Sequence, residues 1–274
     1  MKISKKLITA IAMLTLSFVM LVTSSFAWFS MNTNVKATGM SVSAKADQLF
    51  LQIVKGTETF DSAKPQVEAL INSSKAEMIP VTPAQSATND DPDTVENERK
   101  LNSLVESDSV LAANSIKWFF STSDNPDAHG AAVDFADVTG QLTESAQKYW
   151  SINEFKIRLN PAAGLTTATK PLTCSVNIAT ATEDAIAKSI SVLVVCGENA
   201  MLFKQGDTLN SWTKIGKKLT TNAFANPTSD ANDQGVSVKA YIFFDGENAN
   251  CKTNNVNASA YSVDIFFSVS NEIA

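Results

Sequence analysis

The chain has 274 residues, a formal net charge of −6 and a hydrophobic share of 44%. The acidic balance argues against nucleic acid and anionic lipid headgroups as partners. The length allows one large all-β domain or two smaller ones, with a sizeable core. Three cysteines are too few for a disulfide framework, and their odd number leaves at least one thiol unpaired within the monomer.

The N-terminus has the three zones of an export signal. A basic start with three lysines precedes residues 7–22, which carry no charge. Ser25 and Ala27 then place small side chains at the two positions that a signal peptidase holds closely, just before Trp28. We therefore predict a signal peptide over residues 1–27 and secretion to the cell surface or the extracellular matrix.

A retained N-terminal anchor is the competing interpretation. The uncharged run of 16 residues is shorter than the roughly 20 that cross a bilayer, so it would have to extend through Phe29. The protein would then contact the membrane only through this uncleaved segment. In both cases we expect residues 28–274 to form a single β-sandwich domain.

The first strand region of the expected domain covers residues 35–46. Its small and apolar residues alternate, and the alternation changes phase once, at a glycine, which is typical of a β-bulge. These residues are Val35, Ala37 and Gly39 in one phase, then Met40, Val42 and Ala44 in the other. A second phase change places the next apolar residues at 49–53, so we expect two short strands or one bent strand.

Later strands have a simpler pattern. Alternating apolar residues predict four of them, whereas an almost entirely apolar fifth segment predicts a central strand covered on both faces. The alternating segments are residues 151–160, 172–180, 236–244 and 261–269, and the apolar segment is residues 190–196. We expect the last two strands, which flank a polar loop, to be antiparallel neighbours.

Helical patterns are fewer. Residues 94–114 carry a partial helical stripe, and residues 64–72 and 182–189 could each form a short helix. Residues 76–93, with three prolines and an acidic cluster, are typical of an exposed loop. The sequence therefore predicts a mainly β sandwich with a partly helical insertion at about residues 60–115.

Catalytic motifs are missing from the sequence. His129 is the only histidine, which excludes a zinc site with two histidine ligands, and no glycine-rich phosphate loop or nucleophile elbow occurs. We predict neither enzymatic activity nor a cofactor or metal site; a hydrolase with an unrecognised carboxylate pair is the remaining enzymatic alternative. Two acidic clusters carry the oxygen ligands that calcium prefers, but we interpret them as solvated loops: Asp90, Asp91, Asp93 and Glu96, and Asp124 with Asp127.

Cysteines and aromatic residues fall within the apolar strand patterns. Cys174 and Cys196 both lie on apolar faces, which favours buried free thiols, with a bridge between the two as the alternative. Aromatic residues cluster at 118–120, 149–150 and 243–244, where core packing is favoured over a carbohydrate-binding platform.

Several segments carry a family resemblance. The export signal, the AWFSMN segment at 27–32 and the small-residue strand that follows resemble the TasA/camelysin family, fibre-forming proteins of Gram-positive biofilm matrices that are processed by a SipW-type signal peptidase. Segments resembling clostridial surface proteins lie at residues 116–130, 149–159, 239–251 and 261–270. Camelysin has been described as a metalloprotease; that activity is not carried over, because this chain lacks a zinc motif.

The resemblance implies a jelly-roll-like antiparallel β-sandwich that assembles into fibres by donor-strand complementation. The segment that matches the donor runs from Trp28 through about Ala46. Its small side chains suit the groove of an acceptor, but they would equally suit a strand of their own subunit, and both interpretations stay open here. The leading hypothesis is an exported structural protein that self-associates; the alternative is a monomeric surface adhesin or carbohydrate-binding module, with a surface glycan or matrix protein as partner.

Overall fold

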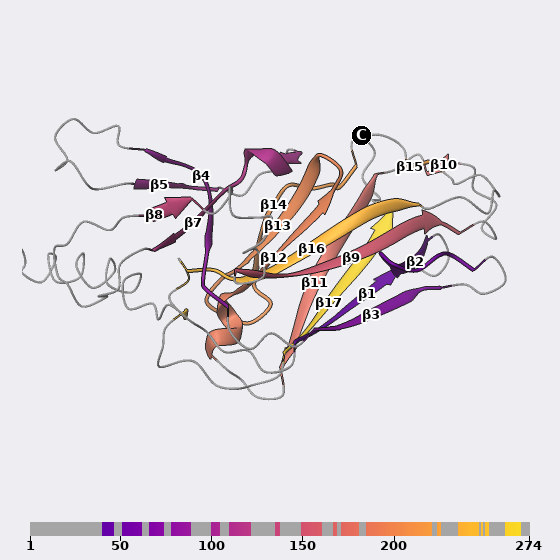
Figure 1. Ribbon diagram of the computed structural model, residues 1–274, viewed down its shortest axis with the longest axis horizontal. Helices are drawn as coiled ribbons and strands as arrows, with labels where there is room; N and C mark the ends of the chain where they lie inside the picture. The colour runs from indigo at the N-terminus through magenta and orange to yellow at the C-terminus, as the bar shows by residue number, and fades with distance from the viewer. Residues whose placement is uncertain are drawn as a thin grey trace, which may run out of the picture.

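The computed structural model describes residues 40–46, 51–61, 66–73, 78–88, 100–104, 110–121, 135–137, 149–160, 167–168, 171–180, 185–220, 224–225, 235–246, 248, 250–251 and 261–269. Strands dominate these residues (Figure 1). They are β1 (Met40–Ala46), β2 (Leu51–Lys55), β3 (Glu68–Ser73), β4 (Thr82–Thr88), β5 (Lys100–Ser103), β6 (Leu111–Ala112), β7 (Lys117–Ser121), β8 (Phe135–Asp137), β9 (Trp150–Leu159), β10 (Thr167–Ala168), β11 (Leu172–Thr180), β12 (Ile190–Cys196), β13 (Asn199–Gln205), β14 (Trp212–Ile215), β15 (Phe224–Ala225), β16 (Val236–Phe244) and β17 (Tyr261–Val269). Two 3-10 segments are η1 (Ala113–Ser115) and η5 (Ala185–Ser189).

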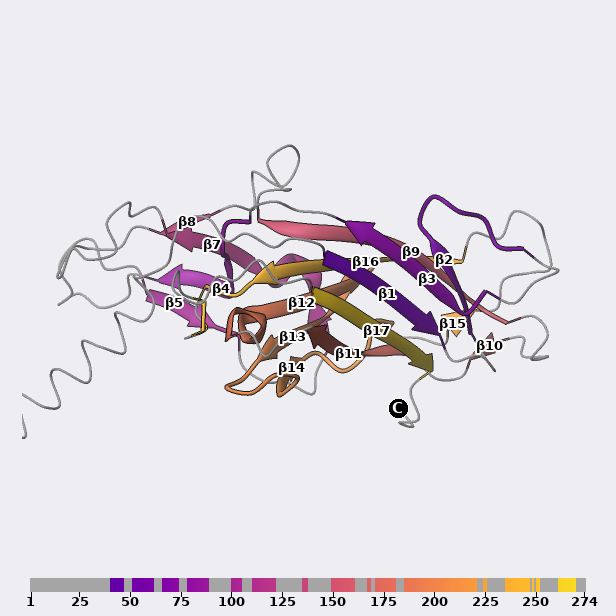
Figure 2. The ribbon, with the colours of Figure 1, turned by 90° about the horizontal axis from the view of Figure 1, so that it is seen from below.

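Two sheets form the main body of the fold. The first has the strand order β11-β17-β1-β3, and the second has the order β14-β13-β12-β16-β9-β2, with β6 beside β13. Figure 2 shows β1 between β17 and β3. A single buried cluster draws its residues from both sheets, so the two sheets pack face to face over a shared hydrophobic core. The prediction of a mainly β, sandwich-like fold is confirmed.

A third sheet, with the order β5-β4-β7-β8, explains why β12 is apolar on both faces. Val192 and Val194 belong to the core between the two main sheets. Leu193 instead joins a second cluster with Trp118 of β7 and Val81. A central strand covered on both sides needs no polar face, which accounts for the almost entirely apolar run.

The predicted helical insertion is wrong for the part of residues 60–115 that the structure describes. Strands β3, β4 and β5 occupy it, and its helical content is the single 3-10 turn η1. β4 pairs with β5 and β7, although Pro83 made this region resemble a loop. Pairing between strands that are distant in sequence overrides the weak helical stripe, because that stripe offers no complete apolar face to bury. The helical pattern at 182–189 corresponds to η5, a 3-10 segment.

The expected pairing of the last two strands is also wrong. β16 lies in the second sheet, between β12 and β9, whereas β17 lies in the first, between β11 and β1. Both strands present an apolar face to the same core, so their alternation is equally compatible with facing each other across the sandwich. Alternation reports which face of a strand is buried; it does not report which strand lies beside it.

Candidate functional site

The strand β1 is the candidate site, because it fills an interior position of the first sheet. It runs parallel to β17, with Val42 opposite Val263 and Ala44 opposite Ile265. On its other side it runs antiparallel to β3, with Val42 opposite Ile71. The β1–β17 ladder is the one parallel strand pairing within the residues that the structure describes. β1 therefore makes main-chain hydrogen bonds along both of its edges.

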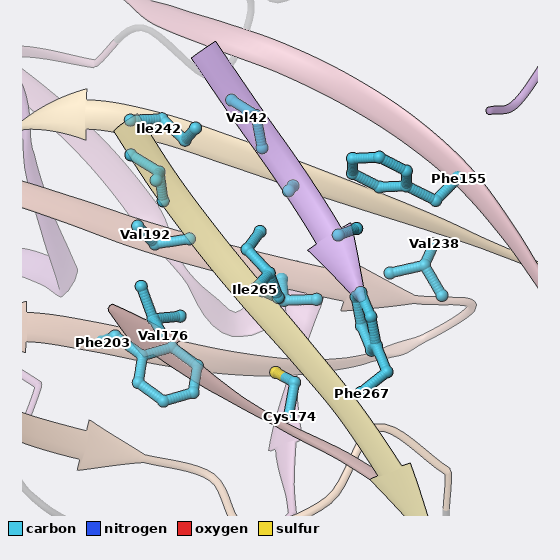
Figure 3. Close-up of a cluster of buried hydrophobic side chains, with 14 of the residues drawn as sticks. Val42, Phe155, Cys174, Val176, Val192, Phe203, Val238, Ile242, Ile265 and Phe267 are labelled. Carbon is cyan, nitrogen blue, oxygen red and sulfur yellow. The ribbon is translucent and has the colours of Figure 1, made fainter. Parts of the chain in front are cut away.

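The inward face of β1 carries small side chains into the core. Val42 and Ala44 are fully buried, and Ala46 is nearly so. Large side chains of β17 lie beside the small ones, since Ala44 is opposite Ile265 and Ala46 is opposite Phe267. Figure 3 shows Val42, Ile265 and Phe267 with Phe155, Val192, Val238 and Ile242 of the second sheet. The slot between β17 and β3 therefore accepts an alternating strand with small inward residues.

The outward face of β1 makes polar contacts that depend on register. The Ser43 hydroxyl donates a hydrogen bond to the Asp264 carboxylate. The Lys45 ammonium lies 3.9 Å from a Glu68 carboxylate oxygen and 5.6 Å from the centre of the Phe266 ring. Exposed ion pairs of this kind stabilise by about 1 kcal/mol at most. A shift by one residue would place Ser43 and Lys45 in the core, so these contacts and the alternation specify the same register.

The outer edge of the first sheet is obstructed at β11, and one further contact lies just before β3. On β11, the Ile178 amide donates to the Asn210 side-chain oxygen at 2.7 Å, and the Asn210 amide donates back to the Ile178 carbonyl at 2.9 Å. Farther along β11, the Leu219 amide donates to the Leu172 carbonyl at 2.8 Å. Near the start of β3, the Gln66 carbonyl accepts a hydrogen bond from Ile53 of β2 at 2.7 Å. The contacts along β11 disfavour adding a further strand at that edge.

Many sequence-predicted site residues lie outside the described residues. These are Ser25, Ala27, Trp28, Val35, Ala37, Gly39, Asp90, Asp91, Asp93, Glu96, Asp124, Asp127 and His129. Of the predicted donor residues, the structure places the Met40 backbone and all of Val42 and Ala44 in β1. Within the described part of the chain, no group of three or more His, Cys, Asp or Glu residues is arranged to hold a metal ion. No helix among the described residues is long and apolar enough to cross a membrane.

All three cysteines are buried free thiols, so the structure contains no bridge between Cys174 and Cys196. The Cys174 sulfur instead lies 3.9 Å from the Met201 sulfur. Burial raises the pKa of the Cys251 thiol to about 12 and raises the pKa of Cys174 and Cys196 above the usual range. At neutral pH the thiols are protonated and shielded from solvent, which suits packing rather than chemistry.

The raised pKa values of these thiols predict that the folded protein loses stability at alkaline pH. Because their pKa is higher in the folded protein than in the unfolded chain, the folded state keeps protons that the unfolded state releases. We expect the free energy of unfolding to fall as pH rises from about 9 toward 12, by up to about 1.4 kcal/mol per pH unit for each thiol. Urea unfolding at pH 8 and pH 10.5 measures the slope, and a Cys251→Ala variant should have the shallower one. Equal slopes would contradict the prediction.

The clustered aromatic residues pack inside the molecule. The Trp118 ring centre lies 5.1 Å from that of Trp150 and 4.8 Å from that of Phe243, and all three residues belong to the second buried cluster. Core packing is therefore confirmed for them. The buried polar contact between Lys204 and Asp245, beside this cluster, was not predicted, because neither residue belongs to a recognisable motif.

The pairing partners of β1 were also missed by sequence reasoning. Glu68 and Asp264 flank the strand, but they are distant from it in sequence and no local pattern links them to it. β1 is therefore an interior strand whose contacts with β17 and β3 specify one register, in a sheet whose β11 edge is obstructed. Comparison of the chain with protein-family models, curated proteins and solved structures gives no match.

Proposed function

We propose that the protein is an exported structural subunit of a cell surface or biofilm matrix, and that it assembles into fibres by donating its β1 segment to a neighbouring copy. The observation that carries the proposal is the interior position of β1, the first strand described, between β17 and β3. The resemblance of the N-terminal sequence to TasA-like fibre proteins supports the same conclusion. The protein acts through self-association and performs no catalysis.

Strand donation has a simple energetic basis. A β1 strand from a second copy would make the same hydrogen bonds to β17 and β3 as the resident strand. It would also bury Val42 and Ala44 in the same core. Exchange of an identical element therefore costs little beyond the rearrangement of the connecting segment. Because contacts obstruct the β11 edge of the first sheet, replacement of β1 is favoured over addition of a strand at that edge.

The finer description of the fold as a jelly roll belongs to this proposal. It is supported by repeated crossings between the two main sheets. The chain passes from β1 in the first sheet to β2 in the second and returns to β3, and it crosses again from β16 to β17. Such crossings place strands that are consecutive in the sequence in opposite layers, as in double-sheet folds.

A disulfide trap tests the donation. Lys45 of β1 and Glu68 of β3 are paired across antiparallel strands, within the Cα separation that a disulfide spans. Their replacement by cysteine removes a weak exposed ion pair and the contact of Lys45 with the Phe266 ring. We expect the reduced Lys45→Cys/Glu68→Cys variant to form fibres. Oxidation after assembly should then link different chains and produce a ladder on a non-reducing denaturing gel, whereas oxidation before assembly should block fibre formation.

A matched control uses strands that both belong to the acceptor. Ser175 of β11 and Phe266 of β17 are also antiparallel partners with exposed side chains, so Ser175→Cys/Phe266→Cys should close within one chain in every state. If the β1–β3 trap also closes only within single chains of assembled material, β1 is not donated. If no condition yields fibres, a monomeric adhesin becomes the better description.

A further inference from the structure

A partly buried lysine and a buried aspartate meet at the end of the second sheet. Asp245 directly follows β16 and is 2% exposed. The Lys204 ammonium, from β13, lies 3.3 Å from Asp245 Oδ2, and the Lys204 side chain is itself 16% exposed. The other oxygen, Oδ1, accepts a long hydrogen bond of 3.4 Å from the Thr82 hydroxyl of β4. One carboxylate oxygen therefore faces an amine and the other faces a hydroxyl donor.

Backbone contacts hold this carboxylate in place. The Asp245 amide donates to the Ser189 carbonyl at 2.7 Å, and the Gly246 amide donates to the Val81 carbonyl at 3.1 Å. Val81 also forms a parallel bridge with Asp245. The aspartate is fixed on both sides by segments distant in sequence, so its side chain has little freedom to leave Lys204.

The strand between the two residues carries a third polar group. β12 lies between β13 and β16, and its Ser191 is paired with Phe243. Paired residues share a face of the sheet, and Asp245 lies two residues beyond Phe243, so Ser191 and Asp245 lie on the same face. Lys204 shares that face, because Leu202, two residues before it, packs in the same cluster as Phe243. The Ser191 hydroxyl is buried and has no hydrogen-bond partner.

We propose that Lys204 and Asp245 condense into an intramolecular isopeptide bond. The ammonium first transfers one proton to Oδ2, which leaves a neutral amine and a carboxylic acid. The amine nitrogen then attacks the carboxyl carbon, while negative charge develops on Oδ1, toward which Thr82 donates. The bond from carbon to Oδ2 breaks, a second proton passes from the nitrogen to Oδ2 through the Ser191 hydroxyl, and one water leaves.

The product would join β13 to the end of β16 across the intervening β12. No oxidant, metal or co-reactant is required, because the condensation releases only water. Because the fold holds the amine next to the carboxyl group, their effective concentration is far higher than that of free lysine and aspartate side chains in solution. The bond closes residues 205–244 into a covalent loop that survives unfolding, and it resists reduction, unlike a disulfide. It is independent of strand donation, since both residues lie in the second sheet and its loops.

Mass spectrometry of the full chain under denaturing conditions tests the bond. We expect the folded and then denatured protein to have a mass lower by one water than its sequence requires. Proteolysis should release a branched peptide that joins the Lys204 and Asp245 segments, and tandem fragmentation should locate the linkage. A Lys204→Arg variant, which keeps the positive charge but cannot form this amide, should have its full sequence mass.

The Lys204→Arg variant also distinguishes the isopeptide bond from another reaction that loses one water. Gly246 follows Asp245, so a succinimide at this step would also remove one water. Succinimide formation does not need Lys204 and would persist in Lys204→Arg. If that variant fails to fold, the presence or absence of the branched peptide from the natural chain still shows whether the isopeptide bond forms. Full sequence mass for the folded natural chain, with no branched peptide, would overturn the proposal, as would a water loss that Lys204→Arg retains.

Discussion

Replacement of Val42 by aspartate is expected to destabilise the fold by about 4 kcal/mol or more at neutral pH. Val42 is fully buried and faces the core between the two main sheets. Burial without a partner raises the pKa of a carboxyl group by about three units or more, and each unit corresponds to about 1.4 kcal/mol. Urea unfolding followed by circular dichroism measures the loss, which should shrink as pH is lowered and the carboxyl group is protonated.

Ser41→Asp provides the matched control on the same strand. Ser41 has the opposite orientation and is partly exposed, so a carboxylate there should change the free energy of unfolding by less than about 1 kcal/mol. Equal stability of Val42→Asp and the natural protein would mean that β1 does not occupy its slot in solution. The comparison therefore tests both the fold and the premise of strand donation.

Replacement of Asp245 by alanine is expected to cost about 3–5 kcal/mol, because the change removes the carboxylate that a partly buried lysine contacts. The residue also contacts Thr82, so the loss reaches β4 as well as β13. We expect this loss if the two side chains form an ion pair. We also expect it if they are joined by an isopeptide bond, because the variant cannot form the covalent loop. Thermal and urea unfolding of the purified variant measure it.

An exposed ion pair in the same sheet is the control for this prediction. Lys239 and Glu154 approach to 2.9 Å, closer than Lys204 and Asp245, but their side chains are 46% and 50% exposed. Solvent screens such a pair, and Glu154→Ala should cost less than about 1 kcal/mol. If the two alanine variants lose similar stability, burial is not what makes the Asp245 contact important.

Strand identity could be predicted where a strong alternating or apolar pattern marks the buried faces. β11 and β17 follow their alternating patterns, and the almost entirely apolar β12 is covered on both faces. The prediction failed at β3, β4 and β5, where weak patterns become strands through pairing with other segments, and it did not include β13. Local sequence encodes which face is apolar, whereas a strand without a strong pattern is decided by its partner.

The candidate site could be predicted only in part. The sequence pointed to Val42 and Ala44 as small inward residues of a strand, and both are buried in β1. It could not supply the parallel partner β17, because that pairing joins the first and last described strands. The Lys204–Asp245 contact was equally invisible, since its residues meet only through the order of strands in the second sheet.

The sequence by itself determined the β class, the apolar faces of the principal strands and the small-residue character of β1. These properties depend on side-chain periodicity and size, which are local. Only the tertiary structure decided that β1 lies between β17 and β3 and that β16 and β17 belong to opposite layers. The physical reason is that backbone hydrogen bonds are the same for every strand, so the choice of partner depends on the packing of the whole core.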